Sequence, residues 1–318
     1  MVVVNYVLAS ALAVTTFHGF ILGVAGHGYV QNVNTNGQDY TGWLPFSDPY
    51  ADPVPARVIR KIPSDGPSEC FEAHLACNTG GETGASVSAS VPAGSSVTFD
   101  WTNWPADHLG PVSSYMASCN GDCANFNVKG AQWFKIDASG YDQSTSTWAS
   151  AELIANNNSW TSTVPKQLAS GHYLIRHEIV ALHSTGQPQY YPSCLQVNVT
   201  GGGSSTPSGD DLVSIPGLYD NVAWPDIWTD FGSFTIPGPA IVFTDSTGST
   251  PSGVASASAS GSQTAAPSKT AAASTTPEKS ATPTRAATSS PLVSTGRCKA
   301  KKSRASAFKR HASIRRSH

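Results

Sequence analysis

The chain has 318 residues, enough for one large domain or two small ones, and its 39% hydrophobic content allows a sizeable core. Only 13% of residues are charged, while Gly, Ser, Thr, Asn and Pro are abundant, which is typical of β-rich secreted proteins. Residues 297–318 hold nine of the 19 Lys and Arg residues and no acid, so the rest carries ten bases against all 21 acids, a net charge of −11. This acidic majority excludes general nucleic-acid binding, because phosphate contacts need positive charge.

Residues 1–26 contain no charged side chain and include a run of apolar residues, which predicts a secretory signal peptide and an extracellular protein. A membrane anchor is the alternative, but Thr15 and His18 lie within the apolar run, and no later stretch is long and apolar enough to span a bilayer. Cleavage after Gly26 would make His27 the first residue of the mature chain. Cleavage after Ala25 would leave Gly26 first, and the small residues permit either cut.

Residues 27–243 are expected to form the folded domain, because short strand candidates separated by turn signals are typical of a sandwich or barrel. Long segments lie between these strands, notably 34–72, with its many Pro and Gly residues, and such loops are often functional. The strand candidates are residues 86–92, 96–101, 133–137, 171–183 and 194–200.

Residues 244–296 are rich in Ser, Thr, Ala and Pro, which predicts a disordered linker. The basic segment 297–318 forms a separate tail that lacks the cysteines and aromatic residues of a small cellulose-binding module.

Six cysteines and two sequons are consistent with export. Most of the cysteines of a secreted chain should pair, although the sequence alone leaves the connectivity open. Cys119 and Cys123 are close enough in sequence to close a tight loop around Gly121. N-glycosylation is predicted at Asn157 and Asn198, which begin the sequons Asn-Asn-Ser and Asn-Val-Thr.

An N-terminal His27 would offer a metal two nitrogens, its α-amine and its ring Nδ1. A second imidazole would complete a tetragonal arrangement of three nitrogens, which suits copper better than zinc. Without further support, an ordinary surface histidine is the alternative interpretation of His27.

Three later stretches supply that support. His108 stands in His-Leu-Gly-Pro-Val, Arg176 begins Arg-His-Glu-Ile with His183 seven residues later, and Gln189 begins Gln-Tyr-Tyr-Pro-Ser-Cys. In this order after His27, these motifs resemble the fungal lytic polysaccharide monooxygenases of auxiliary activity family nine, over residues 27–243.

The resemblance implies an all-β, immunoglobulin- or fibronectin-III-like β-sandwich with long loops and one copper ion per chain. It implies that His27 and His108 are equatorial ligands and that Tyr191 is the axial residue. His183 and Gln189 would lie beside them as hydrogen-bond donors towards the oxygen co-substrate.

The resemblance also implies substrate contacts and disulfides. Polysaccharide would lie on a flat face that carries Tyr219, with Tyr29 and Trp43 as weaker candidates. For Trp43 a packing role is at least as reasonable. The implied disulfides are Cys77–Cys194 and Cys119–Cys123, while Cys70 and Cys298 either pair with each other or stay free.

The implied reaction is oxidative cleavage of β-1,4-glycosidic bonds in cellulose or related glucans, at C1 and/or C4. It uses O2 or H2O2 and an external electron donor, in a monomer that binds neither membrane nor nucleic acid. The alternatives are a non-catalytic copper-binding protein, a carbohydrate-binding module and a two-carboxylate hydrolase, for which no distinctive acidic pair is present.

Overall fold

The computed structural model describes residues 27–68 and 73–244. The predicted signal peptide, nearly all of the predicted linker, and the basic tail lie outside the described residues, as do Cys70 and Cys298. No helix in the described ranges is long and apolar enough to cross a membrane.

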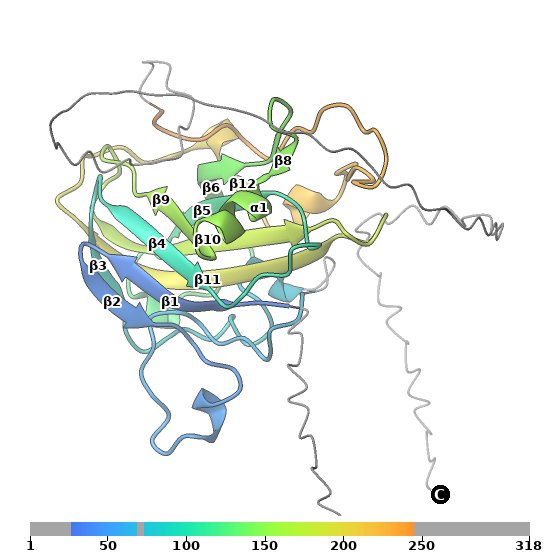
Figure 1. Cartoon of the computed structure of the whole chain (residues 1–318). Coiled ribbons are helices and arrows are strands. Elements are labelled where there is room, and N and C mark those ends of the chain that lie inside the picture. Colours follow the sequence, from blue (N-terminus) through green and yellow to red (C-terminus); the bar gives the residue numbers. More distant parts are fainter. Residues whose placement is uncertain (1–26, 69–72, 245–318) are drawn as a thin grey trace, which may run out of the picture.

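Two sheets face each other and form a sandwich (Figure 1). The smaller sheet has the strand order β2-β1-β4-β9, and all of its neighbouring strands run antiparallel. The larger sheet has the order β12-β6-β5-β10-β11-β3, with β11 and β3 parallel. The strands are β1 (Val30–Thr35), β2 (Gln38–Thr41), β3 (Ala89–Pro92), β4 (Ser96–Trp101), β5 (Val112–Ser118), β6 (Gln132–Ser139), β9 (Ser159–Thr163), β10 (Gly171–Ala181), β11 (Gln189–Thr200) and β12 (Val213–Ser214).

The main core lies between the two sheets. Val33 and Phe99 of the smaller sheet belong to the same buried cluster as Ile175, Leu195 and Val197 of the larger sheet. In β4 buried and less buried residues alternate, because one face of an antiparallel sheet can remain near solvent. The expected all-β sandwich with long loops is therefore confirmed.

The larger sheet is also covered on its outer face. Every residue of β10 from Tyr173 to Ala181 is buried, and a second cluster includes Leu174 and Val180 of that strand. This cover is an outer layer of loops and short elements, so β10 is buried along this length instead of alternating, and it carries the buried polar residues Arg176, His177 and Glu178 in its middle. The short elements of the described chain as a whole are β7 (Tyr141–Asp142), β8 (Thr147–Trp148), α1 (Ala149–Ala155), η1 (Asp48–Tyr50), η2 (Ala73–Ala76), η3 (Cys123–Asn125), η4 (Gly209–Asp211) and η5 (Gly217–Tyr219).

Both implied disulfides are present. Cys77–Cys194 joins the end of η2 to β11 across a sequence separation of 117, and Cys119–Cys123 closes a loop with a separation of 4. The first bridge fastens the outer layer to the larger sheet, and in the chain-entropy picture a loop of this length contributes several kcal/mol, on the order of 4–5.

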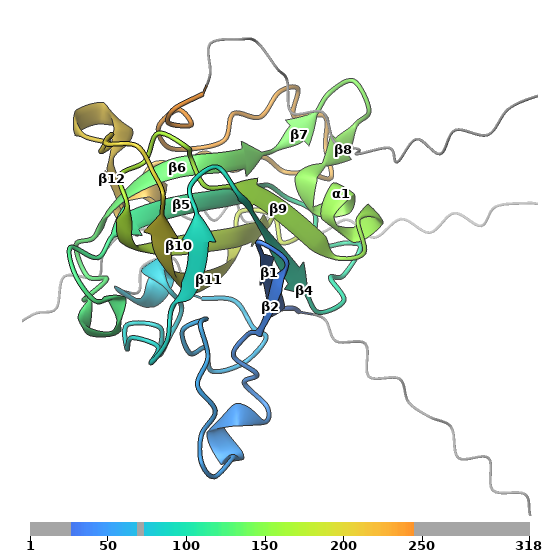
Figure 2. The same cartoon turned by 90° about the vertical axis from the view of Figure 1, so that its left-hand side faces the viewer.

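The segment 34–72 holds more regular structure than the sequence analysis expected. Asn36 and Gly37, with φ of 51° and 76°, form the two-residue turn of a hairpin in which Thr35 of β1 pairs with Gln38 of β2. An Asn-Gly pair favours this mirror-image turn, because both residues tolerate positive φ. The loop that carries η1 projects away from the sandwich in Figures 1 and 2, whereas Val58 and Ile59 return to the main core, where Ile59 bridges Leu195 of β11.

Candidate metal centre

His27 lies just before β1, at one end of the sandwich. The next residues are fixed to the end of β4, because Tyr29 N donates to Thr102 Oγ1 at 3.2 Å and Thr102 N donates to Tyr29 O at 2.9 Å. A Cβ on Gly28 would lie 3.0 Å from the Trp104 ring, a tight contact that favours glycine where the chain passes this indole. His27 is thus held beside Trp104 by its neighbours.

The His108 loop explains the spacing of the His-Leu-Gly-Pro-Val motif. A Cβ on Gly110 would lie 1.8 Å from the Val180 carbonyl oxygen, so this position requires glycine for close approach to β10. Leu182 N donates to Leu109 O at 2.8 Å, and Val180 N donates to Pro111 O at 3.1 Å. The motif therefore docks the loop onto β10 and its end.

The His108 ring has one nitrogen engaged and one open. Its Nδ1 lies 2.9 Å from Asp107 Oδ1, while Nε2 is buried and has no hydrogen-bond partner. This hydrogen bond lowers the pKa of the Asp107 carboxyl. The Asp107 carboxylate fixes the tautomer with Nδ1–H and leaves the Nε2 lone pair free, which is the state that a metal requires.

Tyr191 and Gln189 lie on one face of β11, because they are two residues apart in a strand. Tyr191 is buried, and its hydroxyl donates to Gln189 Oε1 at 2.7 Å. This bond leaves the Gln189 amide N–H groups as donors. The Tyr191 ring lies 6.0 Å from the His27 ring and 4.9 Å from Trp104, and burial raises the pKa of its phenol.

His183 follows the end of β10 and stacks on His108, with ring centroids 3.8 Å apart and an interplanar angle of 23°. Its Nδ1 is buried without a partner. Burial, followed by the neighbouring His108, lowers the pKa of the His183 ring. The structure thus brings His27, His108, His183, Gln189 and Tyr191 together, as the motifs predicted.

These residues fit a copper ion. The His27 and His108 rings are 5.6 Å apart and nearly perpendicular, and the orphaned Nε2 of His108 needs a partner. Within residues 27–68 and 73–244, no group of three or more His, Cys, Asp or Glu side chains could hold a metal. Two imidazoles and a phenol are the donors that this cluster could offer to a metal, and the α-amine of a processed His27 would complete three nitrogens.

The expectation that Tyr219 is an exposed substrate contact is wrong. Tyr219 is 3% exposed, and its hydroxyl donates to Glu178, which also pairs with the fully buried Arg176. Two buried charged groups need every available polar partner, so Tyr219 serves the outer layer as a hydrogen-bond donor. Trp43 is also buried, and its Nε1 donates to Ile62 O at 3.1 Å, in agreement with the packing alternative.

Other aromatic side chains are exposed. Tyr29 is half-buried and lies 6.3 Å from Phe46, which is 60% exposed, and Tyr50 in the projecting η1 is 83% exposed. Trp228 is 59% exposed, and its Nε1 donates to His183 O at 2.9 Å. Sequence reasoning missed all three exposed rings, because no local motif marks an aromatic residue as exposed.

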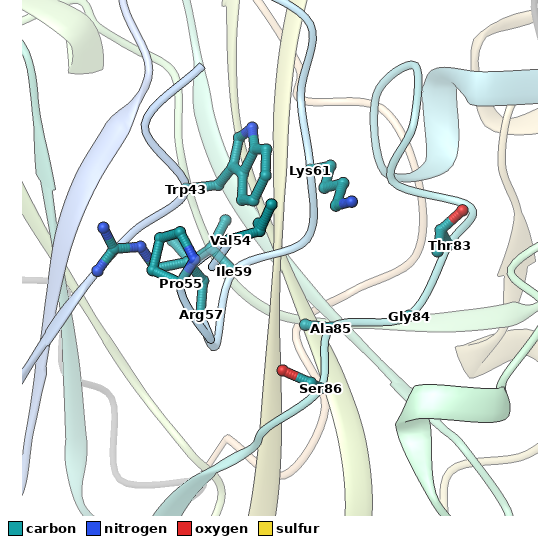
Figure 3. Close-up of a pocket in the computed structure, with 10 residues that line it drawn as sticks. All are labelled: Trp43, Val54, Pro55, Arg57, Ile59, Lys61, Thr83, Gly84, Ala85 and Ser86. Carbon is teal, nitrogen blue, oxygen red and sulfur yellow. The ribbon is translucent and has the colours of Figure 1, made fainter. Parts of the chain in front are cut away.

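A separate pocket of about 200 Å³ contains none of the predicted metal or donor residues (Figure 3). It lies between the segment after η1, with Arg57 and Lys61, and residues 83–86. Arg57 is already paired with Asp48 at 2.8 Å, and Lys61 Nζ lies 5.1 Å from the Trp43 ring centre. This pocket is therefore distinct from the histidine cluster.

Comparison with known proteins agrees with the fold and the site. The sequence model of auxiliary activity family 9 (formerly GH61) matches residues 27–234. The AA9 family lytic polysaccharide monooxygenase B of Gloeophyllum trabeum is 42% identical over 236 residues, which covers 69% of this chain and 92% of the relative. The monooxygenase B of Heterobasidion irregulare is 40% identical over 230 residues, covering 69% of this chain and 92% of that relative.

Solved structures show the same likeness. The crystal structure of HiLPMO9B has a TM-score of 0.60 and 38% identity, and the match covers 68% of this chain and 99% of that one. The extended catalytic domain of H. jecorina LPMO9A has a TM-score of 0.63 and 36% identity, over 68% of this chain and 91% of that one.

The sandwich and its two-histidine site define a copper-dependent oxidoreductase that acts on polysaccharide with the help of a reductant. The chain belongs to auxiliary activity family 9, the family of lytic polysaccharide monooxygenases formerly called GH61.

Proposed function

We propose that the mature, secreted protein begins at His27 and that the His27 α-amine and ring and His108 Nε2 would hold one copper ion, with the Tyr191 phenol beside them. The observation that carries this proposal is the buried, unpartnered Nε2 of His108 beside the His27 and Tyr191 rings. The family match also starts at His27, the residue after the predicted leader. Bound copper would supply one-electron chemistry towards an oxygen co-substrate.

The protein's own residues have separate tasks in this reaction. Asp107 holds the His108 ring in the ligating tautomer. His183 and the Gln189 amide are placed to donate hydrogen bonds to O2 or H2O2, while the Tyr191–Gln189 bond fixes the orientation of that amide. Trp104 covers the buried side of the cluster, with Tyr191 at 4.9 Å and His108 at 5.8 Å, and so excludes water there.

The proposed substrate is cellulose or a related β-1,4-glucan. Tyr29 and Phe46 on the His27 side, and Trp228 on the His183 side, present rings that can stack on pyranose faces. Hydroxylation at C1 or C4 would place a new hydroxyl on a carbon that also bears the glycosidic oxygen, and collapse of this unstable carbon to a carbonyl would expel that oxygen and break the glycosidic bond. This route needs no pair of acid and base carboxylates.

The remaining proposals concern the exported chain. Asn157 is exposed beyond α1 and Asn198 is half-buried in β11, and both are proposed glycosylation sites. We expect a monomer that binds neither membrane nor nucleic acid.

The test combines chemistry and processing. The secreted protein is sequenced from its N-terminus and incubated with swollen cellulose, with and without ascorbate and with a copper chelator. We expect His27 as the first residue and oxidised oligosaccharides that require ascorbate and disappear with the chelator. A different first residue would refute the ligand set. Cellulose and copper binding without oxidised products from any glucan would instead favour a non-catalytic binding protein.

A further inference from the structure

The loop that carries His183, residues 182–188 between β10 and β11, is held from two sides. On the side of His108, Leu182 N donates to Leu109 O at 2.8 Å. On the other side the loop meets the segment 226–228, which lies beside the β10–β11 turn in Figure 1. Because His183 Nδ1 has no partner, the ring depends on its stacking with His108 and on this fixed main chain.

Asp226 and Trp228 fasten the loop at two points. Asp226 Oδ1 accepts hydrogen bonds from Thr185 Oγ1 at 3.0 Å and from Trp228 N at 3.1 Å. Trp228 Nε1 donates to His183 O at 2.9 Å. The single polar atom of the indole is therefore used to hold His183, while the ring itself remains 59% exposed.

We propose that Trp228 is a positioning residue for His183, and that its exposed indole links the polysaccharide face to the placement of the His183 ring. The link to polysaccharide rests on the proposed function; the link to His183 rests on the hydrogen bond alone. A sugar stacked on the indole would restrict the same side chain whose N–H fixes the His183 carbonyl. Substrate binding thereby orders a hydrogen-bond donor beside the metal site.

The decisive variant is Trp228→Phe, which keeps a flat apolar ring but removes the pyrrole part of the indole together with its N–H. We expect its binding to swollen cellulose to change by less than about twofold, because the stacking face remains. Loss of one hydrogen bond should speed amide hydrogen exchange in residues 182–188 of the metal-free protein by about fivefold. In the copper-loaded protein, kcat should fall by about fivefold, with KM for the polysaccharide unchanged.

Two further variants complete the test. Asp226→Ala removes the second fastening point and should raise exchange in the same loop. Asp142→Ala is the matched control, because Asp142 Oδ1 caps a similar turn by accepting from Ser144 N at 2.8 Å, on the β7–β8 hairpin, and its loss should leave residues 182–188 unchanged.

Unchanged exchange of residues 182–188 in Trp228→Phe would overturn the positioning role. A rise in KM without a fall in kcat would also overturn it, since Trp228 would then be a substrate contact only. The exchange measurement needs neither copper nor turnover, so it judges this proposal even if the wild-type protein oxidises no glucan, an outcome that would refute the proposed function alone.

Discussion

His177 and His183 lie six residues apart, yet the middle of β10 and the loop at its end give them opposite roles. The His177 ring is fully buried, stacks on Phe99 at 4.3 Å and shares a hydrogen bond of 2.9 Å between Nδ1 and Ser114 Oγ. His183 instead stacks on another histidine and is only half-buried. Each ring keeps one nitrogen without a hydrogen-bond partner, so the difference lies in access: the strand interior encloses His177 between Phe99 and Trp101, whereas the loop leaves His183 beside a second imidazole and near solvent.

The largest effect is predicted for a substitution that breaks the polar network in the interior of β10. Glu178→Gln removes the carboxylate that pairs with the buried Arg176 and should lower the free energy of unfolding by about 3–5 kcal/mol, because a buried cation is left uncompensated. Urea unfolding measures this change. The folded fraction should still bind copper as the wild-type protein does, and a weaker copper affinity would contradict the separation of the two regions.

The opposite result is expected at the metal site, where a substitution should weaken copper binding more than it lowers stability. His108→Ala should weaken copper binding by more than about 100-fold. Loss of a residue that only hydrogen-bonds a metal ligand already costs up to about 100-fold, and His108 is proposed as a ligand itself. Isothermal titration of the protein that begins at His27 measures the affinity. The free energy of unfolding of the metal-free protein should fall by less than in Glu178→Gln, because His108 is buried but its loss leaves no buried charge uncompensated. Unaltered copper affinity would exclude His108 as a ligand.

Acid should destabilise the protein through His177. Burial, together with the neighbouring Arg176, lowers the pKa of this ring from 6.5 to about 3, so the folded state resists a proton that the unfolded chain accepts. Stability should be unaffected by this group above the unfolded pKa, and should be lost progressively as the pH falls from 6.5 towards 3. The loss reaches about 2 kcal/mol at pH 5.

His177→Phe isolates this contribution. Burial raises the pKa of Asp137, which therefore acts on stability with the opposite sign. The His177 contribution is the change in the free energy of unfolding between pH 7 and pH 5 in the wild type minus the same change in His177→Phe. An equal loss of stability in His177→Phe and wild type would show that another group causes the acid sensitivity.

The smallest predicted effect concerns His183. His183→Ala should lower turnover by about tenfold and the free energy of unfolding by less than about 1 kcal/mol, because it removes an oriented donor but no core contact. Initial rates of oxidised product formation at saturating polysaccharide measure the change. His74→Ala is the control, since His74 lies 3.3 Å from Glu82 and outside the site, and it should leave turnover unchanged.

Much of this arrangement could be predicted from the sequence, because short motifs encode local geometry. Gly110 in the His108 motif marks a close approach to β10, and the two-residue spacing of Gln189 and Tyr191 places both on one strand face. The β-sandwich and both disulfides were likewise expected and are confirmed.

The errors came from tertiary context. Tyr219 looked like a surface ring, but the charge of Glu178, distant in sequence, draws its hydroxyl into the outer layer. The exposure of Phe46, Tyr50 and Trp228 depends on how the loops pack around them, and no pattern in the sequence predicts that packing.

The Cys77–Cys194 bridge has a consequence for an enzyme that works among reductants. Both half-cystines are only 1% exposed, beneath the outer layer. Thiol exchange requires a thiolate to reach a sulfur atom in line, and the folded protein offers no such approach here. A small donor can therefore deliver electrons at the histidine end of the sandwich without cutting the covalent link that fastens its other layer.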